Sequence, residues 1–515
     1  MPFLKYTNEI AINMLKSIAT AVLLLTAPTV AIAQQKRVVK LSIDQLHPAQ
    51  TIESFGASDA WGCQFAGQWP DEKRNRMAEL LFSNESTKEG QPLGIGLNFW
   101  RFSIGAGSAE QGASSTIRDE WKRQASFLGL DGNYDWDAMP GQVWFLKAAK
   151  KHGVKEFLAF VNSPHVRFTL NNRAYSTAGE CNLDFSKLDL FTQDIATTIK
   201  GIKTLTGIEL NYISPVNEPQ WKWADPKQEG CPYTNEELAR LVRNLSEQLI
   251  KNKLPTKIQI SDAGQLDYLY GQGKSKGHQV KAFFDPDSKE YLAGLSNVDR
   301  SISGHSYFTT SPEKRAVDIR KKVAEEVAKI KDLRYWMSEY CVLGDDSLAG
   351  PGRDLGMETA LFIAKLMHHD LSISNATSWQ WWLAISPGDY KDGLVYIDRN
   401  KEDGKVYDSK LLWAMGNYSR FIKPGSRRLP VEMTGSDGNR IHVSAYQEGK
   451  KLVTVVVNRT DDNILLDLAT NKTKYKKAET YVTSGQHNLF PLEKYNKQTE
   501  INIPAQSVTT VISNP

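Results

Sequence analysis

Short apolar runs alternate with amphipathic stretches from Ile52 to about Arg420. The apolar runs have the length of buried strands, and the stretches between them have the periodicity of helices with one buried face. Eight runs are predicted to be strands: Ile52–Ser58, Asn98–Ile104, Glu156–Asn162, Glu209–Val216, Lys257–Ser261, Ser301–His305, Arg334–Ser338 and Ala376–Trp382. Eight strand–helix units in one continuous stretch indicate an α/β protein and favour a closed (β/α)8 TIM barrel over an open doubly wound sheet.

The stretches between these runs contain helix start and stop signals. Thr234 and Glu237 have the spacing of a capping box before a helical apolar stripe. Ser311-Pro312 predicts the start of another helix with proline in its first turn. Trp144–Lys151 is predicted to be a third helix, ended by Gly153.

The pattern changes after Arg427, where short β-rich runs are separated by Gly, Asp and Asn. The predicted strands there are Ile441–Ala445, Leu452–Val457, Ile464–Leu468, Glu479–Thr483 and Glu500–Ile503. Together they predict a small antiparallel β-sandwich. Arg37–Ile43 is also strand-like and is expected to pair with this sheet. We therefore expect an N-terminal sandwich strand in 34–50, the barrel in 51–425 and a β-sandwich side domain in 426–515.

The longest apolar run lies at the start of the chain. Lys16 precedes the run Ser17–Val30, and Ala31-Ile32-Ala33 follows in small-x-small form. This order is typical of a secretory signal peptide, here 1–33. The run is short for a membrane anchor and is broken by Pro28. The sequence therefore predicts export to the periplasm or the medium, with no membrane span after cleavage.

Composition and charge narrow the class further. Hydrophobic residues make up 41% and charged residues 24% of the 515 residues, which is typical of a globular protein and excludes a disordered or fibrous chain. The formal charge is only +4, from 63 basic and 59 acidic residues, and no compact basic block is present. A nucleic-acid partner is therefore not expected.

No pattern indicates a metal or a cofactor. The four cysteines lack the CxxC or Cys/His spacing of zinc sites. His368-His369-Asp370 is interpreted as a polar helix end, because adjacent side chains on a helix point apart. Gly105-Ala106-Gly107 follows a strand, but Glu110 stands where a dinucleotide site needs its third glycine.

Two glutamates follow predicted strands on opposite sides of the barrel. The fourth strand runs into Asn217-Glu218-Pro219, and the seventh runs into Ser338-Glu339. Active sites of such barrels lie at the carboxyl ends of the strands, so both side chains should reach the same rim. Glycoside hydrolysis needs such a pair, one protonated to serve the leaving oxygen and one ionised. Glu218 and Glu339 are therefore the candidate catalytic residues.

Other strand ends supply candidate substrate-binding residues. Sugars offer hydroxyls that need fixed polar partners and C–H faces that lie on aromatic rings. The candidates are Asp59, Trp61, Arg101, Asn162, Trp221, His305, Tyr307 and Trp379. Trp221 and Trp223 are expected to wall the cleft. On the eighth strand, Trp379 is expected to face the sugar and Trp381 to be the core residue.

The chain resembles glycoside hydrolase family 30. The matching stretches are Thr51–Trp61, Trp100–Ser108, Asn162–Pro164, Pro215–Pro219 and Ser338-Glu339. The resemblance covers nearly the whole chain after the signal peptide and implies a barrel with a β-sandwich built from both termini. It implies a retaining enzyme without metal or cofactor, with carboxyl groups roughly 5–5.5 Å apart.

The same resemblance implies roles for the matching residues. Glu218 would be the general acid/base and Glu339 the nucleophile. Asn217 would hold the sugar 2-hydroxyl, and His305 and Tyr307 would position the nucleophile.

Within the family, the stretches around Trp61 and Glu218 most resemble an endo-β-1,6-galactanase-like branch. A polysaccharide or oligosaccharide substrate is implied, with β-1,6-galactan the first choice. The alternatives are a β-1,6-glucanase, a glucuronoxylanase, a β-glucosidase or β-xylosidase, or a glycan-binding protein without activity. The chain departs from many relatives at Ser163-Pro164-His165-Val166-Arg167-Phe168. His165 and Arg167 there either meet an acidic sugar or are structural.

The cysteines all follow barrel strands. Cys181 and Cys231 follow the third and fourth strands, whose loops are neighbours, so we predict a disulfide that braces the cleft. Cys63 and Cys341 follow the first and seventh strands, which are not adjacent, and are expected to be free buried thiols.

Overall fold

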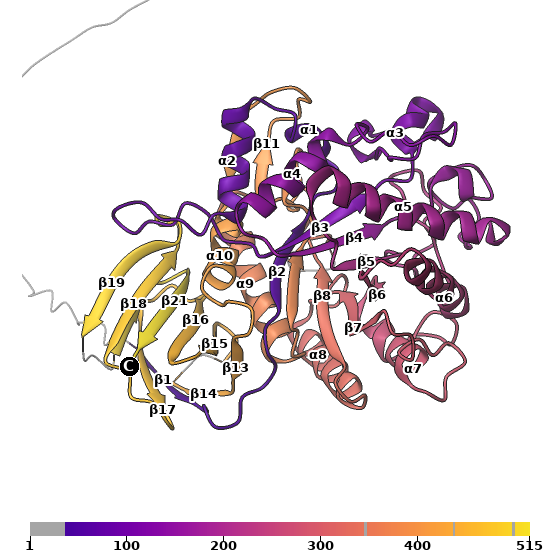
Figure 1. The fold of residues 1–515 in the computed structure, drawn as a ribbon. Helices are drawn as coiled ribbons and strands as arrows, with labels where there is room; N and C mark the ends of the chain where they lie inside the picture. Colours follow the sequence, from indigo (N-terminus) through magenta and orange to yellow (C-terminus); the bar gives the residue numbers. More distant parts are fainter. Residues whose placement is uncertain (1–36, 345–347, 436–437, 497–499) are drawn as a thin grey trace, which may run out of the picture. The chain divides into compact units, whose positions relative to one another are not determined.

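The computed structural model of the chain contains a closed barrel of eight parallel strands, a β-sandwich of two sheets and a small three-stranded sheet (Figure 1). The structure describes residues 37–344, 348–435, 438–496 and 500–515, so the expected signal peptide lies outside the described residues. The barrel strands follow one another in chain order, and β2 pairs with β9 to close the barrel. They are β2 (Ser54–Ser58), β3 (Phe99–Ile104), β4 (Glu156–Val161), β5 (Tyr212–Ser214), β6 (Lys257–Ala263), β7 (Val298–His305), β8 (Arg334–Glu339) and β9 (Ser378–Trp381). All eight predicted strands are present, and the TIM barrel is confirmed.

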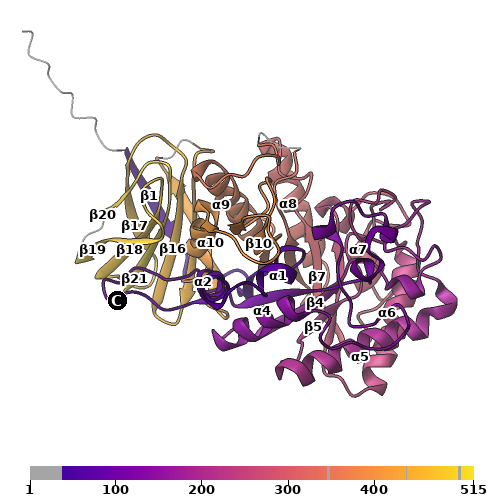
Figure 2. The same ribbon diagram turned by 90° about the horizontal axis from the view of Figure 1, so that it is seen from above.

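Helices surround the barrel strands (Figures 1 and 2). The α-helices are α1 (Gly62–Ala66), α2 (Asp71–Phe82), α3 (Ser108–Gln111), α4 (Pro140–Lys151), α5 (Leu188–Thr206), α6 (Asn235–Lys251), α7 (Gln279–Phe284), α8 (Glu313–Ala328), α9 (Met357–Ser372) and α10 (Lys410–Ser419). Short 3-10 helices lie in the loops: η1 (Gly112–Ser115), η2 (Glu120–Lys122), η3 (Val166–Phe168), η4 (Phe185–Lys187) and η5 (Leu266–Leu269).

The helix start and stop signals in the sequence coincide with observed helix ends. The Thr234 hydroxyl accepts from the Glu237 N–H at 3.2 Å, and the Glu237 carboxylate accepts from the Thr234 N–H at 2.8 Å, which completes the capping box of α6. Pro312 is the N-cap of α8. α4 ends where predicted but begins earlier, at Pro140.

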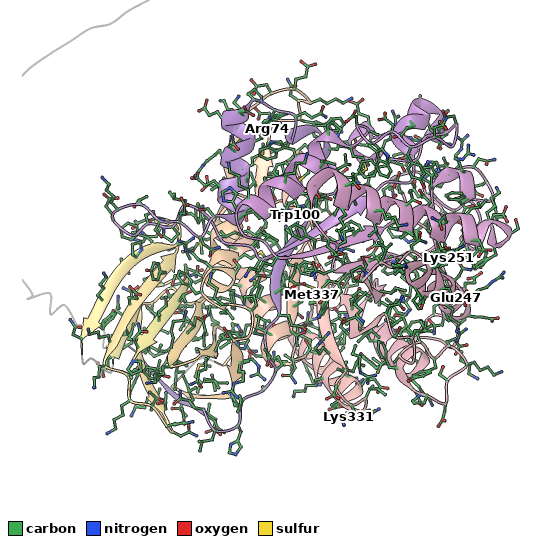
Figure 3. The ribbon with its side chains drawn as sticks, viewed as in Figure 1. Arg74, Trp100, Glu247, Lys251, Lys331 and Met337 are labelled. Carbon is green, nitrogen blue, oxygen red and sulfur yellow. The ribbon has the colours of Figure 1, made fainter. Side chains whose placement is uncertain are left out.

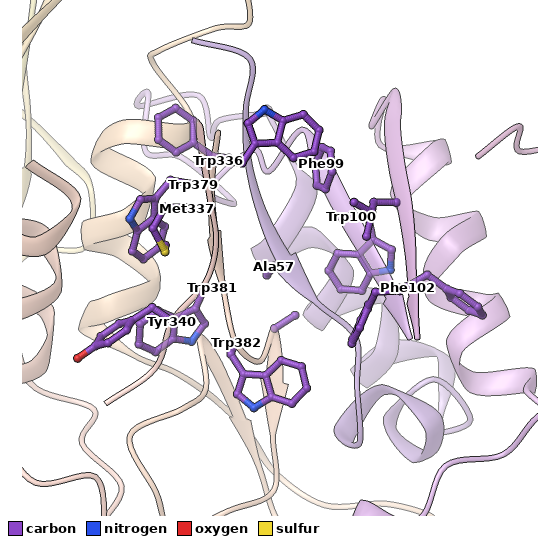
Figure 4. Close-up of a cluster of buried hydrophobic side chains, with 14 of the residues drawn as sticks. Ala57, Phe99, Trp100, Phe102, Trp336, Met337, Tyr340, Trp379, Trp381 and Trp382 are labelled. Atoms are coloured by element: carbon purple, nitrogen blue, oxygen red, sulfur yellow. The ribbon is translucent and has the colours of Figure 1, made fainter. Parts of the chain in front are cut away.

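Apolar side chains fill the barrel and the layer under the helices. In α6, Leu241 and Leu245 are buried, whereas Glu247 and Lys251 point outward from the same helix (Figure 3). Across the barrel, Phe99 and Trp336 meet edge to face with ring centroids 5.8 Å apart (Figure 4). This packed interior fixes the strand ends that carry the polar residues of the rim.

The two further sheets are built mostly from the C-terminal region. A six-stranded sheet has the order β13-β15-β16-β21-β18-β19, and a four-stranded sheet has the order β14-β1-β17-β20. Their strands are β1 (Arg37–Ile43), β13 (Arg427–Leu429), β14 (Val431–Thr434), β15 (Ile441–Glu448), β16 (Lys451–Asn458), β17 (Ile464–Thr470), β18 (Lys477–Thr483), β19 (Phe490–Asn496), β20 (Glu500–Ile503) and β21 (Ser507–Asn514). The five strands predicted in this region are present, and β13, β14, β19 and β21 were not predicted.

The N-terminal strand β1 joins the C-terminal sheet, as predicted. It pairs with β14 in the antiparallel sense and with β17 in the parallel sense. The expectation of a purely antiparallel sandwich is therefore wrong at one pairing. The parallel pair arises because β1 comes from the far end of the chain, so no hairpin constrains its direction.

Residues Arg37–Pro515 form one unit in which the barrel and the sandwich pack together. Asn417 of α10 donates hydrogen bonds to Thr510 of β21 at 3.0 Å and to the carbonyl oxygen of Tyr481 at 2.9 Å. A small sheet of β10 (Ile385–Ser386), β11 (Val395–Ile397) and β12 (Val406–Asp408) is formed by the segment between β9 and α10. In the described part of the chain, no helix has both the length and the apolar character needed to cross a membrane.

Candidate active site

A cavity of about 530 Å³ opens where the barrel strands end. Its lining combines carboxylates from the strand ends with several large aromatic side chains. The lining residues include Trp61, Lys122, Asn217, Glu218, Trp221, Trp223, Tyr307, Phe308, Glu339, Cys341, Trp382, Tyr390 and Asp392. They come from the ends of six barrel strands, β2, β3, β5, β7, β8 and β9, and from the loops after them, which only the closed barrel brings to one place.

Glu218 and Glu339 face each other in this cavity. Glu218 follows β5 with a left-handed backbone (φ 47°), and its N–H donates to the carbonyl oxygen of Asp262 at 2.9 Å. Glu339 is the last residue of β8. One carboxylate oxygen of each lies within 4.8 Å of the other and of a ring nitrogen of His305. This closeness matches the separation of about 5–5.5 Å in retaining glycosidases and not the roughly 6.5–9.5 Å of inverting ones.

His305 lies beside both glutamates. Its Nδ1 is 2.9 Å from Oε1 of Glu218 and 3.7 Å from Oε1 of Glu339, and its Nε2 is 3.6 Å from Oδ1 of Asp262. Burial lowers the pKa of His305, but the charges of Glu339, Asp262 and Glu218 outweigh burial and raise this pKa to about 9. The imidazole is therefore charged at neutral pH. Glu218, His305 and Glu339 are close enough to surround an ion, but hydrolysis by two carboxyl groups needs none.

The pKa of Glu218 is raised above its ordinary value. Burial is the main cause and the nearby charge of Glu339 adds to it, while the hydrogen bond from His305 opposes the rise. A raised pKa is the shift that a general acid needs. Tyr307 donates a hydrogen bond from its hydroxyl to Oε1 of Glu339 at 3.0 Å, and Arg101 donates to the other oxygen of Glu339. These two donors hold both oxygens of the Glu339 carboxylate in place.

A buried polar network underlies the pair, and its centre is Asp262, a residue that the sequence analysis missed. Asp262 accepts from the hydroxyls of Ser214 and Ser338, each at 2.6 Å. Burial raises its pKa, but Arg101 and His305 outweigh burial and hold this pKa far below its usual range. Asp262 directly follows the predicted strand Lys257–Ser261, so the rule that found the other rim residues would also have found it.

Asn217 lines the cavity above this network. Its side-chain oxygen accepts from Nη2 of Arg101 at 2.8 Å. The NH2 group is therefore the part of Asn217 left for a ligand.

Aromatic rings form the walls, as expected for Trp221 and Trp223. Trp221 packs edge to face against Phe308, with centroids 5.7 Å apart. The Trp223 indole N–H donates to the carbonyl oxygen of Glu218 at 3.0 Å. Trp61 meets Trp382 edge to face at 5.1 Å, and both line the cavity.

The expectation that Trp379 faces the sugar is wrong. Trp379 and Trp381 are fully buried and stack on each other with centroids 6.2 Å apart, because residues two apart in a strand share a face. The Trp379 indole N–H donates to Asp370 of α9 at 3.0 Å. Trp382, one residue after the strand, turns away from this pair (Figure 4) and lines the cavity.

Four other candidates do not line the cavity: His305, which lies beside the two glutamates, and Asp59, Arg101 and Asn162. Asp59 is fully buried, accepts from the Ser103 N–H at 2.8 Å, and has its pKa raised to about 8 by burial. Arg101 is also fully buried and acts through Glu339 and Asn217. Asn162 is 4% exposed and is not among the lining residues. The expectation that Asp59 and Arg101 contact the substrate is therefore wrong. Their hydrogen bonds instead support the residues at the rim of the barrel.

His165 and Arg167 also lie outside the cavity lining. Nδ1 of His165 accepts from the Arg167 N–H at 3.3 Å, and the Arg167 guanidinium donates to the carbonyl oxygen of Leu130 at 2.5 Å. Burial lowers the pKa of His165 to about 4, so this ring is neutral. These contacts favour the structural alternative over an acidic-sugar contact.

The predicted disulfide between Cys181 and Cys231 is wrong for this structure, in which all four cysteines are free. The two loops are neighbours as expected: Cys231 accepts from the Asn182 N–H at 3.4 Å, and a hydrogen bond to Cys231 together with burial raises the pKa of Cys181. Adjacent loops bring the thiols together as hydrogen-bonding partners without joining them. Cys63 and Cys341 are free buried thiols, as predicted.

Comparison with known proteins agrees with this geometry. Residues 38–396 match the model of O-Glycosyl hydrolase family 30, and the chain belongs to that family. It is therefore an O-glycosyl hydrolase with a carbohydrate substrate.

Individual relatives match over most of their lengths. An endo-beta-1,6-galactanase of Hypocrea rufa is 24% identical over 81% of this chain and 81% of its own, and glucuronoxylanase XynC of Bacillus subtilis (strain 168) is 25% identical over 72% and 77%. The crystal structure of a conserved exported protein from Bacteroides fragilis is similar with a TM-score of 0.85 and 31% identity, covering 92% of this chain and 99% of that one.

Proposed function

We propose that the protein is a retaining endo-β-1,6-galactanase that acts by double displacement. The observation that carries the mechanism is the short gap between the carboxylates of Glu218 and Glu339, with a raised pKa at Glu218 and hydrogen bonds from Tyr307 and Arg101 to Glu339. In the first step Glu339 attacks the anomeric carbon, the glycosidic bond breaks, and Glu218 gives its proton to the leaving oxygen.

The second step reverses the role of Glu218. Its carboxylate takes a proton from water, the water oxygen bonds to the anomeric carbon, and the ester to Glu339 breaks. Asn217 would hold the sugar 2-hydroxyl through its free NH2 group. The charged His305 offsets the negative charge that the two carboxylates share during the cycle.

The choice of galactan rests on sequence likeness. The galactanase relative matches a larger share of this chain than the glucuronoxylanase does. Because the two identities are close, a xylan backbone is the second candidate. Analysis of the products from β-1,6-galactan, β-1,6-glucan and glucuronoxylan decides between them, since it reports sugar, linkage and endo or exo action together.

Two substitutions test the roles of the glutamates. Glu218→Gln and Glu339→Gln should each lower kcat by several orders of magnitude while glycan binding persists. Azide should rescue Glu339→Ala and yield a glycosyl azide of inverted configuration. If both Gln variants keep full turnover, the assigned roles are wrong; if the wild-type chain binds glycans without cleaving any, the protein is a glycan-binding protein.

We also propose that the chain is exported, on the evidence of the apolar run Ser17–Val30 and the Ala31-Ile32-Ala33 sequence after it. Mass measurement of the protein from the periplasm or medium of an expressing bacterium should show the loss of residues 1–33. A full-length protein retained in the cytoplasm would contradict export.

A further inference from the structure

Two buried polar groups in the cavity wall have no partner within the described protein. They are Oδ1 of Asp392 and Nε1 of Trp61, and each residue is only 8% exposed. Both residues line the same cavity as Glu218 and Glu339. A buried donor and a buried acceptor without partners carry a free-energy cost that a bound ligand can offset.

Asp392 is held rigidly although it lies in the long segment after β9. Its carbonyl oxygen accepts from the Trp381 indole at 2.7 Å and from the Leu383 N–H at 2.9 Å. These bonds join the residue to the end of the barrel strand, so its carboxyl group keeps a defined place in the wall. Ser386 is a hydrogen-bonding neighbour of this carboxyl group.

Lys122 interacts with both Trp61 and Asp392. Its ammonium lies 4.5 Å from the centroid of the Trp61 ring. Burial raises the pKa of the Asp392 carboxyl group to about 6, and the charge of Lys122 opposes this rise. Among the residues that the structure describes, Lys122 forms no ion pair. Trp61 itself has a positive φ of 60° with ψ −77°, a sparsely populated conformation that costs energy and is most common at functional sites.

The wall is connected to the catalytic pair through two side chains. The Tyr307 hydroxyl that donates to Glu339 also lies 3.8 Å from Sγ of Cys341, and the charge of Asp392 acts on that thiol. The Val342 N–H donates to the carbonyl oxygen of Lys391 at 3.4 Å, so the segment that carries Asp392 runs beside the segment that follows Glu339.

We propose that Asp392 and Trp61 form a subsite that recognises free hydroxyl groups of the sugar bound next to the catalytic pair. Asp392 accepts a hydrogen bond from a sugar hydroxyl, Trp61 donates its indole N–H to a sugar oxygen, and Lys122 balances the charge of Asp392. This subsite selects a neutral sugar with unsubstituted hydroxyls and rejects one that lacks them, because the buried groups would again lose their partners. The proposal rests on the proposed glycosidase function and specifies its substrate.

The test compares enzyme variants with substrates that lack single hydroxyls. The substrates are 2,4-dinitrophenyl β-D-galactoside, the matching glucoside, and the 3-, 4- and 6-deoxy form of each. Asp392→Asn keeps the shape of the side chain and removes its charge, and Trp61→Phe replaces the indole with a phenyl ring and so removes the N–H. Asp389→Asn, an exposed change in the same segment, is the matched control, and thermal unfolding checks that each variant folds.

For at least one hydroxyl, the wild type should lose about 10- to 100-fold in kcat/KM when the hydroxyl is removed, and Asp392→Asn should lose a similar factor on the parent sugar. On that deoxy sugar the variant and the wild type should then be nearly equal. If Asp392→Asn lost the same factor in kcat/KM on the parent sugar and on every deoxy sugar, the proposal would be overturned. It would also be overturned if the wild type cleaved a polysaccharide but none of these glycosides. Failure of the wild type on every glycoside and polysaccharide would instead overturn the proposed function.

Discussion

The substitution Asp262→Asn tests the buried network beneath the catalytic pair. The change keeps the size of the side chain and leaves an oxygen to accept from Ser214 or Ser338. It removes the negative charge whose Oδ1 lies 3.6 Å from Nε2 of His305. The charged form of His305 then loses one of its three carboxylate neighbours.

The size of the effect follows from that distance. At 3.6 Å and an effective dielectric constant of about 20, Coulomb's law gives about 4.6 kcal/mol, which corresponds to about 3 pKa units. The pKa of His305 should therefore fall from about 9 to about 6. At pH 7.5 the imidazole of the variant would be neutral, and the positive charge 2.9 Å from Oε1 of Glu218 would be absent.

The direct assay is an NMR titration of a chain labelled at histidine. The sequence has nine histidines, so the His305 resonance is assigned by its absence in His305→Gln. The pH profile of kcat/KM, measured in parallel, should lose activity in the range between pH 6 and 9 where only the wild type keeps His305 charged. Asp389→Asn serves again as the isosteric control. A His305 midpoint that stays near 9 in Asp262→Asn would refute the electrostatic reasoning.

Three further predictions each concern one feature of the structure. Tyr307→Phe removes one hydrogen bond to Glu339 and should lower kcat/KM about 10- to 100-fold with little change in Tm; steady-state kinetics with an unchanged rate would contradict this role. The pKa of buried His442 is lowered to about 3 by burial, so the folded chain binds fewer protons than the unfolded chain below pH 6.5, and stability present above that pH is lost as the pH falls. Urea unfolding should show a loss of about 2 kcal/mol between pH 7 and 5 from this group, and His442→Gln should reduce the slope; equal slopes would argue against it. Trp379→Phe should lower Tm and leave KM unchanged, whereas Trp382→Ala should raise KM; the reverse result would show that the two rings have been assigned to the wrong sides of the barrel wall.

Local pattern alone determined the eight barrel strands, the main helices and the position of the two glutamates. Strand and helix periodicity depend on neighbouring residues, and the residue after a buried strand reaches the rim of any closed barrel. This is why Glu218 and Glu339 could be recognised without knowledge of the packing.

The tertiary structure decided which side chains near the rim reach the cavity. Trp379, Asp59 and Arg101 follow or belong to the expected strands. Packing against the helices or within the buried network nevertheless keeps their side chains out of the cavity. Asp392 lies ten residues beyond the last predicted strand, and only the bonds of its backbone to the end of β9 bring it to the wall. Contacts of this kind join residues far apart in the chain, and their geometry depends on barrel closure and side-chain packing, which no short-range pattern contains.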